Sequence, residues 1–207
     1  MNCLLSLPSS GFWRRYSYTL WVDAARGSDG DPGTTSRPLQ TLSQAIVLAQ
    51  AISGGAVSIK LRPGTYPIAA NTVITRDHLA IEGLSNPALD ANGLLDHFAT
   101  PVNIVPASLG DQSLWLNLLL LVRANDVAVS RLSFNSSTVN TNGQIFIIPL
   151  QFEGQWPSPQ DMNFQPRALT SESVRLCDFD NWSVAGGFNY ASGSLEQCKV
   201  ENCFVGF

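Results

Sequence analysis

Residues 21–46 read WVDAARGSDGDPGTTSRPLQTLSQAI, and this stretch decides the fold. A short apolar segment is followed by a run rich in Gly, Asp, Ser, Thr and Pro, which is typical of turns. Thr41 and Gln44 then have the spacing of a capping box, in which each side chain bonds a backbone N–H at the start of a helix. Apolar residues recur at helical spacing from Leu42 onward. We therefore predict a helix over about residues 39–52.

The pattern changes from helix to strand after the glycine pair Gly54-Gly55. Val57, Ile59 and Leu61 alternate with polar residues, as expected for a strand with one buried face. Pro63-Gly64 supplies the next turn. The segments that follow are short, rich in Val, Ile and Leu, and separated by Asn, Gly, Ser and Asp. We therefore predict an all-β chain with a single N-terminal helix.

An internal repeat relates the strands to one another. Val129 starts a motif in which apolar residues occupy the first, fourth and sixth positions, and the same spacing starts at Val174 and Val200. A repeat period in the twenties is typical of a solenoid whose coils stack strand on strand. We therefore expect these three valines to lie in one row, with Cys177 and Cys203 as stacked, buried thiols in another.

The motifs around these elements resemble the N-terminal portion of pectate-lyase-like right-handed parallel β-helix proteins. In that family, V-D, G-S-D and G-T motifs lead to a P-x-x-T-L helix and a P-G-T-Y turn. The matching residues are Val22-Asp23, Gly27-Ser28-Asp29, Gly33-Thr34, Pro38 with Thr41-Leu42, and Pro63-Gly64-Thr65-Tyr66. The resemblance implies a right-handed parallel β-helix over residues 20–207, with the helix covering its N-terminal end. Residues 1–19 would then be a leader or an arm that covers a sheet edge.

The two ends of the sequence raise separate expectations. The repeat runs to Phe207 with no covering segment, and an uncovered strand edge recruits other chains. We expect that the native chain continues, that a partner covers the C-terminal coil, or that the chain assembles through it. Arg14 and Arg15 follow the first apolar run instead of preceding it, which makes a poor signal peptide. Two N-x-S sequons, at Asn135 and Asn181, suit a secreted or cell-surface protein, and the compartment stays open.

Composition argues against several kinds of partner. The net charge of −4 provides no basic surface for nucleic acid. No apolar run is long enough to span a membrane. The four cysteines and two histidines lack the spacing of a zinc site, so we expect neither a metal nor another cofactor.

Asp178 and Asp180 are the first candidate catalytic residues. They flank an inward-facing position of the repeat, so both carboxylates point outward, and Arg175 lies at the bend before them. Carboxylates on alternate residues of a strand are about 7 Å apart, within the range that glycosidases use. The repeat brings no further acid beside them, so Ca²⁺ would lack ligands unless a uronate supplied some, as the resemblance to lyases implies. The alternative is a solvated outer face.

A loop at residues 153–167, EGQWPSPQDMNFQPR, interrupts the strand pattern with three prolines. Long loops on a rigid scaffold often bind ligands. Trp156 and Phe164 are therefore candidate ligand-binding residues, which could stack on a sugar ring or anchor a partner. The alternative is that both rings fold back over the outer wall of the coil.

The sequence contains no nucleophile elbow, phosphate-binding loop or metalloprotease motif. We therefore expect a non-catalytic β-helix module that binds a polysaccharide or a protein partner along its side or open end. One alternative is a polysaccharide lyase or hydrolase that acts on acidic polysaccharide through Asp178, Asp180 and Arg175, with Ca²⁺ as a cofactor only in that case. Another alternative is a structural subunit of a larger assembly.

Overall fold

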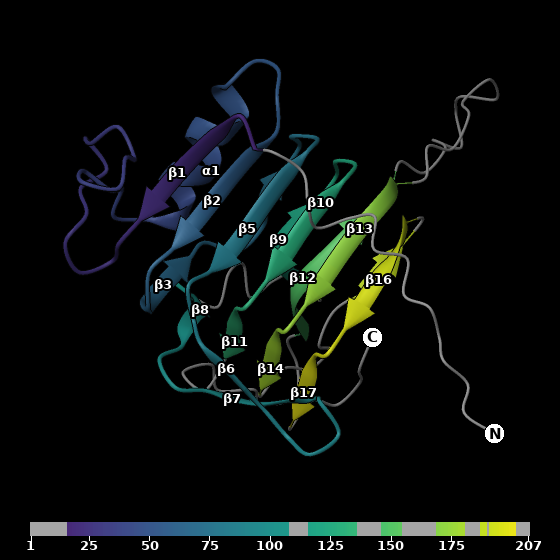
Figure 1. Cartoon of the computed structure of the whole chain (residues 1–207). Coiled ribbons are helices and arrows are strands. Elements are labelled where there is room, and N and C mark those ends of the chain that lie inside the picture. The colour runs from purple at the N-terminus through teal and green to yellow at the C-terminus, as the bar shows by residue number, and fades with distance from the viewer. Residues whose placement is uncertain are drawn as a thin grey trace, which may run out of the picture.

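The chain is mostly β-structure, with three parallel sheets and one helix in the part that the structure describes (Figure 1). The structure is a computed structural model, and it describes residues 16–107, 116–135, 146–154, 169–180, 187–189 and 191–201. The predicted leader up to residue 15, most of the 153–167 loop, and Cys203 lie outside these residues.

Each sheet collects strands from along the whole chain. Sheet A contains β1 (Tyr18–Val22), β2 (Val57–Leu61), β5 (Leu79–Gly83), β10 (Val127–Ser130), β13 (Leu169–Arg175) and β16 (Ala191–Glu196). Sheet B contains β3 (Gly64–Ile68), β8 (Val102–Pro106), β11 (Ser133–Asn135), β14 (Asp178–Asp180) and β17 (Lys199–Glu201). Sheet C contains β4 (Thr72–Ile74), β9 (Leu116–Val122), β12 (Phe146–Glu153) and β15 (Gly187–Asn189).

The chain visits the three sheets in a fixed order, A then B then C, and then returns to A. The successive passages, which we call rungs, are β2-β3-β4, β5-β8-β9, β10-β11-β12, β13-β14-β15 and β16-β17. Every strand of these rungs pairs in parallel with its counterpart in the next rung. Neighbouring rungs therefore bury one another's apolar side chains, and an antiparallel hairpin is the one departure from parallel pairing in the described chain.

The register of sheet A confirms part of the predicted repeat and corrects the rest. Val129 lies opposite Val174, as predicted. Val174, however, faces Leu195 in the next rung, whereas Val200 lies in sheet B opposite Phe179. The expected row of three valines is therefore wrong at its last member. Rungs differ in length because their connections differ, so a fixed period cannot set the register of the last strand.

The inward rows of side chains form a continuous core. In sheet B, Phe134 and Phe179 stack with ring centroids 5.0 Å apart and planes within 2°. The same row continues through Ile104 to Tyr66 in the earlier rungs, and both of these residues are also buried. Because burial of one such side chain stabilises a fold by about 1.5–3 kcal/mol, these rows hold the rungs in register.

The corners between sheets A and B share one backbone conformation. Arg131, Leu176 and Gln197 have φ values of 56°, 51° and 51°, in the left-handed region that residues other than glycine rarely adopt. Each corner hydrogen-bonds to the next one: the N–H of Arg131 donates to the carbonyl of Arg175, and that of Leu176 to the carbonyl of Glu196. The strain of each corner is therefore offset by bonds to its neighbour.

Helix α1 (Leu42–Ala51) packs against β1 to β4 at the N-terminal end of the stack (Figure 1). Thr41 Oγ1 accepts a hydrogen bond from the N–H of Gln44 at 3.1 Å, which is half of the predicted capping box. The other half is replaced, because the N–H of Thr41 donates to Asp29 Oδ1 at 2.9 Å. The helix ends at its C-cap Ile52, before the glycine pair.

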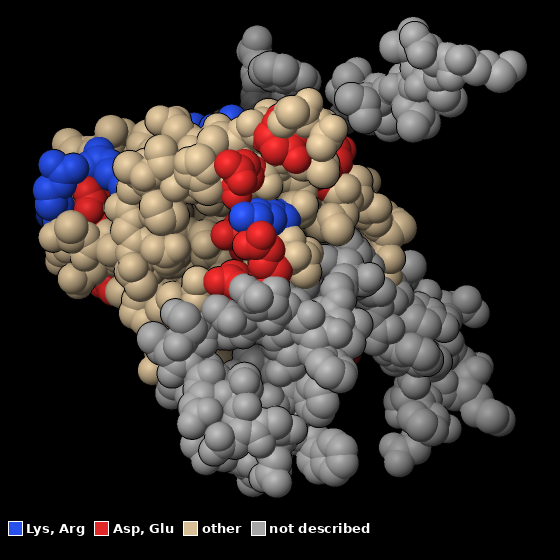
Figure 2. Space-filling model, turned by 90° about the horizontal axis from the view of Figure 1, so that it is seen from below, with Lys and Arg blue, Asp and Glu red and all other residues tan. Residues whose placement is uncertain are grey.

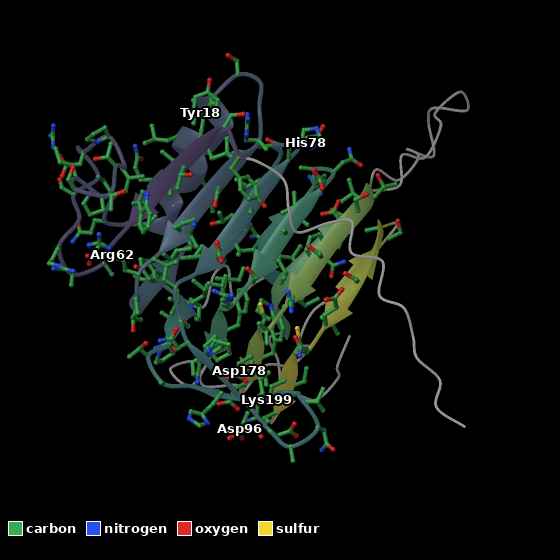
Figure 3. All side chains as sticks on the ribbon, viewed as in Figure 1. Tyr18, Arg62, His78, Asp96, Asp178 and Lys199 are labelled. Carbon is green, nitrogen blue, oxygen red and sulfur yellow. The ribbon has the colours of Figure 1, made fainter. Side chains whose placement is uncertain are left out.

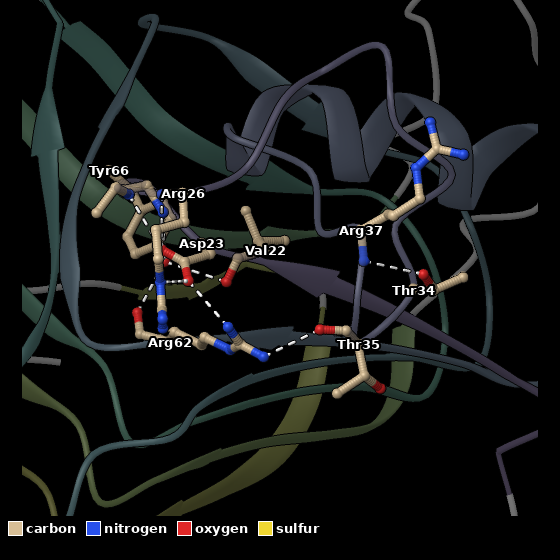
Figure 4. Close-up of polar contacts among 10 residues, drawn as sticks. Val22, Asp23, Arg26, Thr34, Thr35, Arg37, Arg62 and Tyr66 are labelled. Atoms are coloured by element: carbon tan, nitrogen blue, oxygen red, sulfur yellow. Dashed lines mark hydrogen bonds and ion pairs between the residues drawn. The ribbon is translucent and has the colours of Figure 1, made fainter.

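A buried carboxylate, Asp23, fastens the turn-rich loop to the first rung (Figure 4). Asp23 Oδ2 accepts from Arg26 Nε at 3.2 Å and from Arg62 Nη1 at 3.0 Å, and Oδ1 accepts from two backbone N–H groups. Arg62 also donates to the carbonyl of Thr35. The hydroxyl of Tyr66 donates to the carbonyl of Arg62 at 2.7 Å. The motif residues at positions 22–23 and 63–66 therefore stabilise the fold.

Candidate functional site on sheet B

Asp178 and Asp180 lie on the outer face of β14, on either side of the buried Phe179. Their half-buried side chains stand opposite Ser133 and Asn135 of the previous rung. Ser133 Oγ donates to Asp178 Oδ2 at 3.4 Å, and Asn135 Nδ2 donates to Asp180 Oδ2 at 3.3 Å. The outer face of sheet B thus carries two rows of polar side chains that run from rung to rung.

The next rung extends both rows with charged residues. Lys199 lies opposite Asp178, and Glu201 lies opposite Asp180. Lys199 Nζ is 3.1 Å from Glu201 Oε2. The expectation that no further acid lies beside the two aspartates is therefore wrong, because it relied on the misplaced register of the last strand. In the correct register, an acid and a base complete the two rows.

The two aspartates differ in how well their oxygens are satisfied. Asp178 Oδ1 is buried and has no hydrogen-bond partner among the described residues. Burial raises the pKa of Asp178, Lys199 lowers it, and the neighbouring Asp180 and Glu201 raise it again, so that it lies above the ordinary value. The hydrogen bond to Glu201 raises the pKa of Lys199 in turn. Asp178 therefore keeps its proton at a higher pH than an ordinary aspartate does.

An inserted hairpin reaches this site from far along the chain. Strands β6 (Pro87–Leu89) and β7 (Leu95–Phe98) interrupt the second rung between β5 and β8. In the fifth rung, Gln197 Nε2 donates to the carbonyl of Gly93, and Lys199 Nζ donates to the carbonyl of Asp96, both at 2.8 Å. Figure 3 shows Asp96 beside Lys199 and Asp178 at the lower end of the molecule. The hairpin therefore reaches from the second rung to the fifth and brings another acid, Asp96, to the site.

These residues form a charged surface that we call the sheet B patch. Its members are Asp96, Asp178, Asp180, Lys199 and Glu201. Figure 2 views the molecule from below, and acidic side chains lie around a basic one on that face. Carboxyl groups outnumber the single lysine, so the patch is acidic.

The third candidate catalytic residue, Arg175, lies at the end of β13. Its Nε is 3.8 Å from Glu196 Oε2, and its Nη2 donates to Gln197 Oε1 at 3.4 Å. Because Gln197 also holds the hairpin, Arg175 supports the corner beside the patch. The candidate ligand-binding residues Trp156 and Phe164 lie outside the described residues.

Sequence reasoning missed Lys199, Glu201 and Asp96. The first two alternate around Val200 in a short strand, a signal that was present but was assigned the wrong register. Asp96 belongs to a hairpin that the turn residues Asp90 and Asn92 indicate, because Asp90 Oδ1 accepts from the N–H of Asn92. No local pattern shows where that hairpin docks.

Two other kinds of feature are absent from the described residues, a metal-ligand cluster and a membrane-spanning helix. No group of three or more His, Cys, Asp or Glu side chains there is arranged to hold a metal ion. None of the helical structure in the described ranges is long and apolar enough to cross a membrane.

Comparisons with known proteins show the fold. No protein-family model and no curated protein matches the chain. Among solved structures, a rhamnogalacturonan lyase matches with a TM-score of 0.54 and 13% identity, over 90% of this chain and 56% of that one. The GH136 lacto-N-biosidase from Eubacterium ramulus matches with a TM-score of 0.46 and 11% identity, over 91% of this chain and 34% of that one. The pectin methylesterase PemA from Erwinia chrysanthemi matches with a TM-score of 0.40 and 14% identity, over 92% and 55%.

The first of these matches shows a fold in common with the rhamnogalacturonan lyase. The chain spans little more than half the length of the lyase. At this identity the likeness concerns the path of the backbone, and any activity must be argued from the side chains of this chain.

Proposed function

We propose that this chain is a right-handed parallel β-helix module that binds carbohydrate along the outer face of sheet B. The observation that carries the proposal is the pair of polar rows ending in the sheet B patch. In these rows Asp178 and Asp180 are hydrogen-bonded to the previous rung and face Lys199 and Glu201 of the next. Strand spacing places their members about 4.8 Å apart, which is comparable to the length of one sugar unit.

The chemistry of the rows suits a ligand rich in hydroxyl groups. A sugar hydroxyl both donates and accepts hydrogen bonds, and the rows offer carboxylate acceptors, an ammonium donor, and amide and hydroxyl groups. Strand β14, which carries both aspartates, is paired with β11 on one side and β17 on the other, so ordering costs on binding are small there. Similarity in fold to a rhamnogalacturonan lyase supports this class of ligand by analogy alone.

The hairpin supplies a second side to the binding surface, which a flat strand alone does not form. Two carboxylates on one strand flank nothing by themselves, but the segment from Gly93 to Asp96 is fixed against Gln197 and Lys199 beside them. A glycan lying along the rows would thus meet a second wall at the fifth rung. This wall favours binding of a chain end or a branch at that rung over binding of an indefinitely long chain.

The charge of the patch indicates which glycans bind best. Asp96, Asp178, Asp180 and Glu201 surround a single lysine, and this arrangement repels a polyuronate. We expect neutral polysaccharides, such as galactan or arabinan, to bind more tightly than polygalacturonate. Added salt should reduce that preference, because screening weakens the repulsion between exposed charges.

Affinity electrophoresis in gels that contain neutral or acidic polysaccharides tests the proposal. We expect at least one neutral polysaccharide to retard the protein. The variant Asp180→Ala/Glu201→Ala should lose about tenfold in affinity, since it removes charge-assisted hydrogen bonds. Asp31→Asn is the matched control, because Asp31 pairs with Arg37 on the exposed N-terminal loop. Absence of retardation by every polysaccharide, or equal retardation of the double variant, would refute the proposal.

A second candidate function is cleavage of the bound glycan, and the raised pKa of Asp178 favours it. A carboxylic acid with a raised pKa can protonate the leaving oxygen of a glycosidic bond. Asp180 or Asp96 would then be the second carboxylate. Reducing-end and unsaturated-product assays on rhamnogalacturonan, polygalacturonate and neutral glycans distinguish the two functions. Product that disappears in Asp178→Asn would establish cleavage, whereas binding without product from any glycan would exclude it.

A further inference from the structure

Two thiols meet beside the sheet B patch. Cys177 and Cys198 each occupy the second position of a corner between sheets A and B, in the fourth and fifth rungs. Arg175 and Glu196, which precede these corners, are register partners, and the N–H of Lys199 donates to the carbonyl of Cys177 at 2.9 Å. The neighbour of Cys177 in the next rung is therefore Cys198, and Cys203, which was expected in that place, lies outside the described residues.

The two side chains lie at matching positions of neighbouring rungs and have equivalent surroundings. Cys177 Sγ lies 3.5 Å from the carbonyl oxygen of Arg175, and Cys198 Sγ lies 3.4 Å from that of Glu196. Each thiol also points toward a carbonyl of the preceding rung, that of Val129 or that of Val174.

We propose that Cys177 and Cys198 form a modification site, a dithiol that a small disulfide such as glutathione disulfide oxidises to a disulfide joining the fourth and fifth rungs. In-register neighbours in parallel strands have Cα atoms about 4.8 Å apart. That separation lies within the roughly 4.4–6.8 Å that disulfides span.

The surroundings give the two thiols different roles. Cys177 is buried, and burial raises the pKa of its thiol, so it stays protonated. Cys198 is partly exposed, and the hydrogen bond from Cys177 lowers the pKa of its thiol. A low-pKa, accessible thiol beside a second cysteine is the arrangement found at redox-sensitive sites. Cys198 is therefore the attacking group, and Cys177 resolves the intermediate.

The reaction balances with one molecule of oxidant. The thiolate of Cys198 attacks one sulfur of glutathione disulfide, breaking its S–S bond and releasing one glutathione thiolate. Cys177 then gives its proton to solvent and attacks Cys198 Sγ, which releases the second glutathione. Two protein thiols are oxidised, and one oxidant disulfide is reduced to two thiols.

The bond would act directly on the neighbouring patch. Asp178 follows Cys177 and Lys199 follows Cys198, so the disulfide would join the two strands that place these groups side by side. It would also close a loop of about 20 residues, which stabilises the folded state by restricting the unfolded chain. The site thus couples the redox state of the surroundings to the rigidity of the last rungs.

The test uses the full chain with Cys3→Ser and Cys203→Ser, so that only the two thiols remain. After native oxidation with glutathione disulfide, we expect chymotryptic mapping to show a Cys177–Cys198 cross-linked peptide and loss of both free thiols. The melting temperature should rise by about 5–10 °C and fall again on reduction. The added variant Cys177→Ser should instead retain a glutathione adduct at Cys198, and the added variant Cys198→Ser should leave Cys177 unmodified.

Either of two results would overturn the proposal: both thiols remain free for alkylation after oxidation of the folded protein, or Cys198→Ser leaves Cys177 as reactive as before. Neither measurement involves a glycan. Failure of the disulfide therefore leaves the proposed carbohydrate function untouched, and failure of glycan binding leaves the disulfide untouched.

Discussion

Asp23 and Asp178 both lie next to cationic side chains, and their pKa values are shifted in opposite directions. Burial raises the pKa of Asp23, but hydrogen bonds from Arg62, Arg26 and the backbone outweigh it, so the pKa lies below its ordinary value. Asp178 also lies beside a cation, yet one of its oxygens is unsatisfied and its pKa is raised. Lys199 is drawn instead to Glu201 and to the carbonyl of Asp96.

The difference teaches that proximity to a cation does not by itself satisfy a buried acid. Asp23 is stabilised because donors reach both of its oxygens, which is the arrangement of a structural carboxylate. Asp178 keeps an unmet acceptor in the middle of a polar surface, as groups at binding and catalytic sites often do. Asp23 therefore stabilises the fold, whereas the fold keeps Asp178 in an unfavourable environment.

The largest expected effect is on Asp23. Asp23→Ala should lower the free energy of unfolding by about 3–5 kcal/mol, because it leaves the partners of a buried ion pair without an acceptor. Urea denaturation at pH 7 measures it. Because the pKa of Asp23 is lowered in the folded state, its contribution is present above the unfolded value and is lost as pH falls through the folded value. Asp31→Ala, which removes an exposed ion pair, should cost less than about 1 kcal/mol.

Glu172 is a third buried acid, and its hydrogen-bond donors among the described residues are backbone N–H groups. Its carboxylate accepts from the N–H groups of Asp126 and Val127, both at 3.0 Å. Burial raises the pKa of Glu172 to about 8 in spite of these bonds. The folded state therefore keeps a proton that the unfolded chain releases, and stability is greatest below the unfolded pKa and is lost as pH rises toward 8.

We expect Glu172→Gln to flatten this dependence, because the amide does not titrate, and to lower stability at acid pH, because its NH2 group leaves one of the two backbone N–H donors without an acceptor. Denaturation midpoints measured between pH 4 and pH 9 test this expectation. An unchanged slope in the variant would show that Glu172 is ionised in the fold at neutral pH. The matched control is Glu153→Gln, since Glu153 is partly exposed and paired with Arg123.

Substitution of Asp178 should change the free energy of unfolding in the opposite direction to substitution of Asp23. Asp178→Asn removes a carboxylate whose buried oxygen lacks a partner, so it should raise the free energy of unfolding by up to about 1 kcal/mol at pH 7. The gain should shrink at acid pH, where Asp178 is protonated in the parent chain. Asp180→Asn is the control on the same strand and should be close to neutral. A loss of stability in Asp178→Asn would mean that the ionised form is well solvated.

The smallest expected effect concerns the hairpin. Gln197→Ala removes the bond to the carbonyl of Gly93 and should cost about 0.5–1.5 kcal/mol locally. Hydrogen exchange of the amides at residues 87–98 should speed up, while exchange in sheet A stays unchanged. Equal exchange rates in the variant and the parent would show that Leu95 and Phe98, which are buried, hold the hairpin without help from the fifth rung.

Sequence patterns predicted those features that depend on local chemistry. The alternation of Val57, Ile59 and Leu61 indicated a strand, and Thr41 indicated the helix start. The motif residues near Asp23 indicated an ordered N-terminal segment, and in the structure these residues form a hydrogen-bonded cluster. In each case the physical cause lies within a few residues of the signal.

What could not be predicted depends on register and long-range docking. Val200 fits the repeat as well as Leu195 does, because a strand alternates with period two and the adjacent corner imitates the same spacing. That single ambiguity hid Lys199 and Glu201 from the candidate site. The docking of Gly93 and Asp96 on the fifth rung joins residues more than a hundred positions apart, and no local pattern encodes such a contact.

The matching corners at Arg131, Leu176 and Gln197 give this molecule an unusual kind of freedom in size. Since consecutive rungs present the same bend and the same parallel edge, a duplicated rung would find hydrogen-bond partners above and below it. Copying one stretch of the gene could therefore lengthen the polar rows of sheet B without any change in the core. The length of the binding surface on sheet B would then change in evolution by one rung at a time.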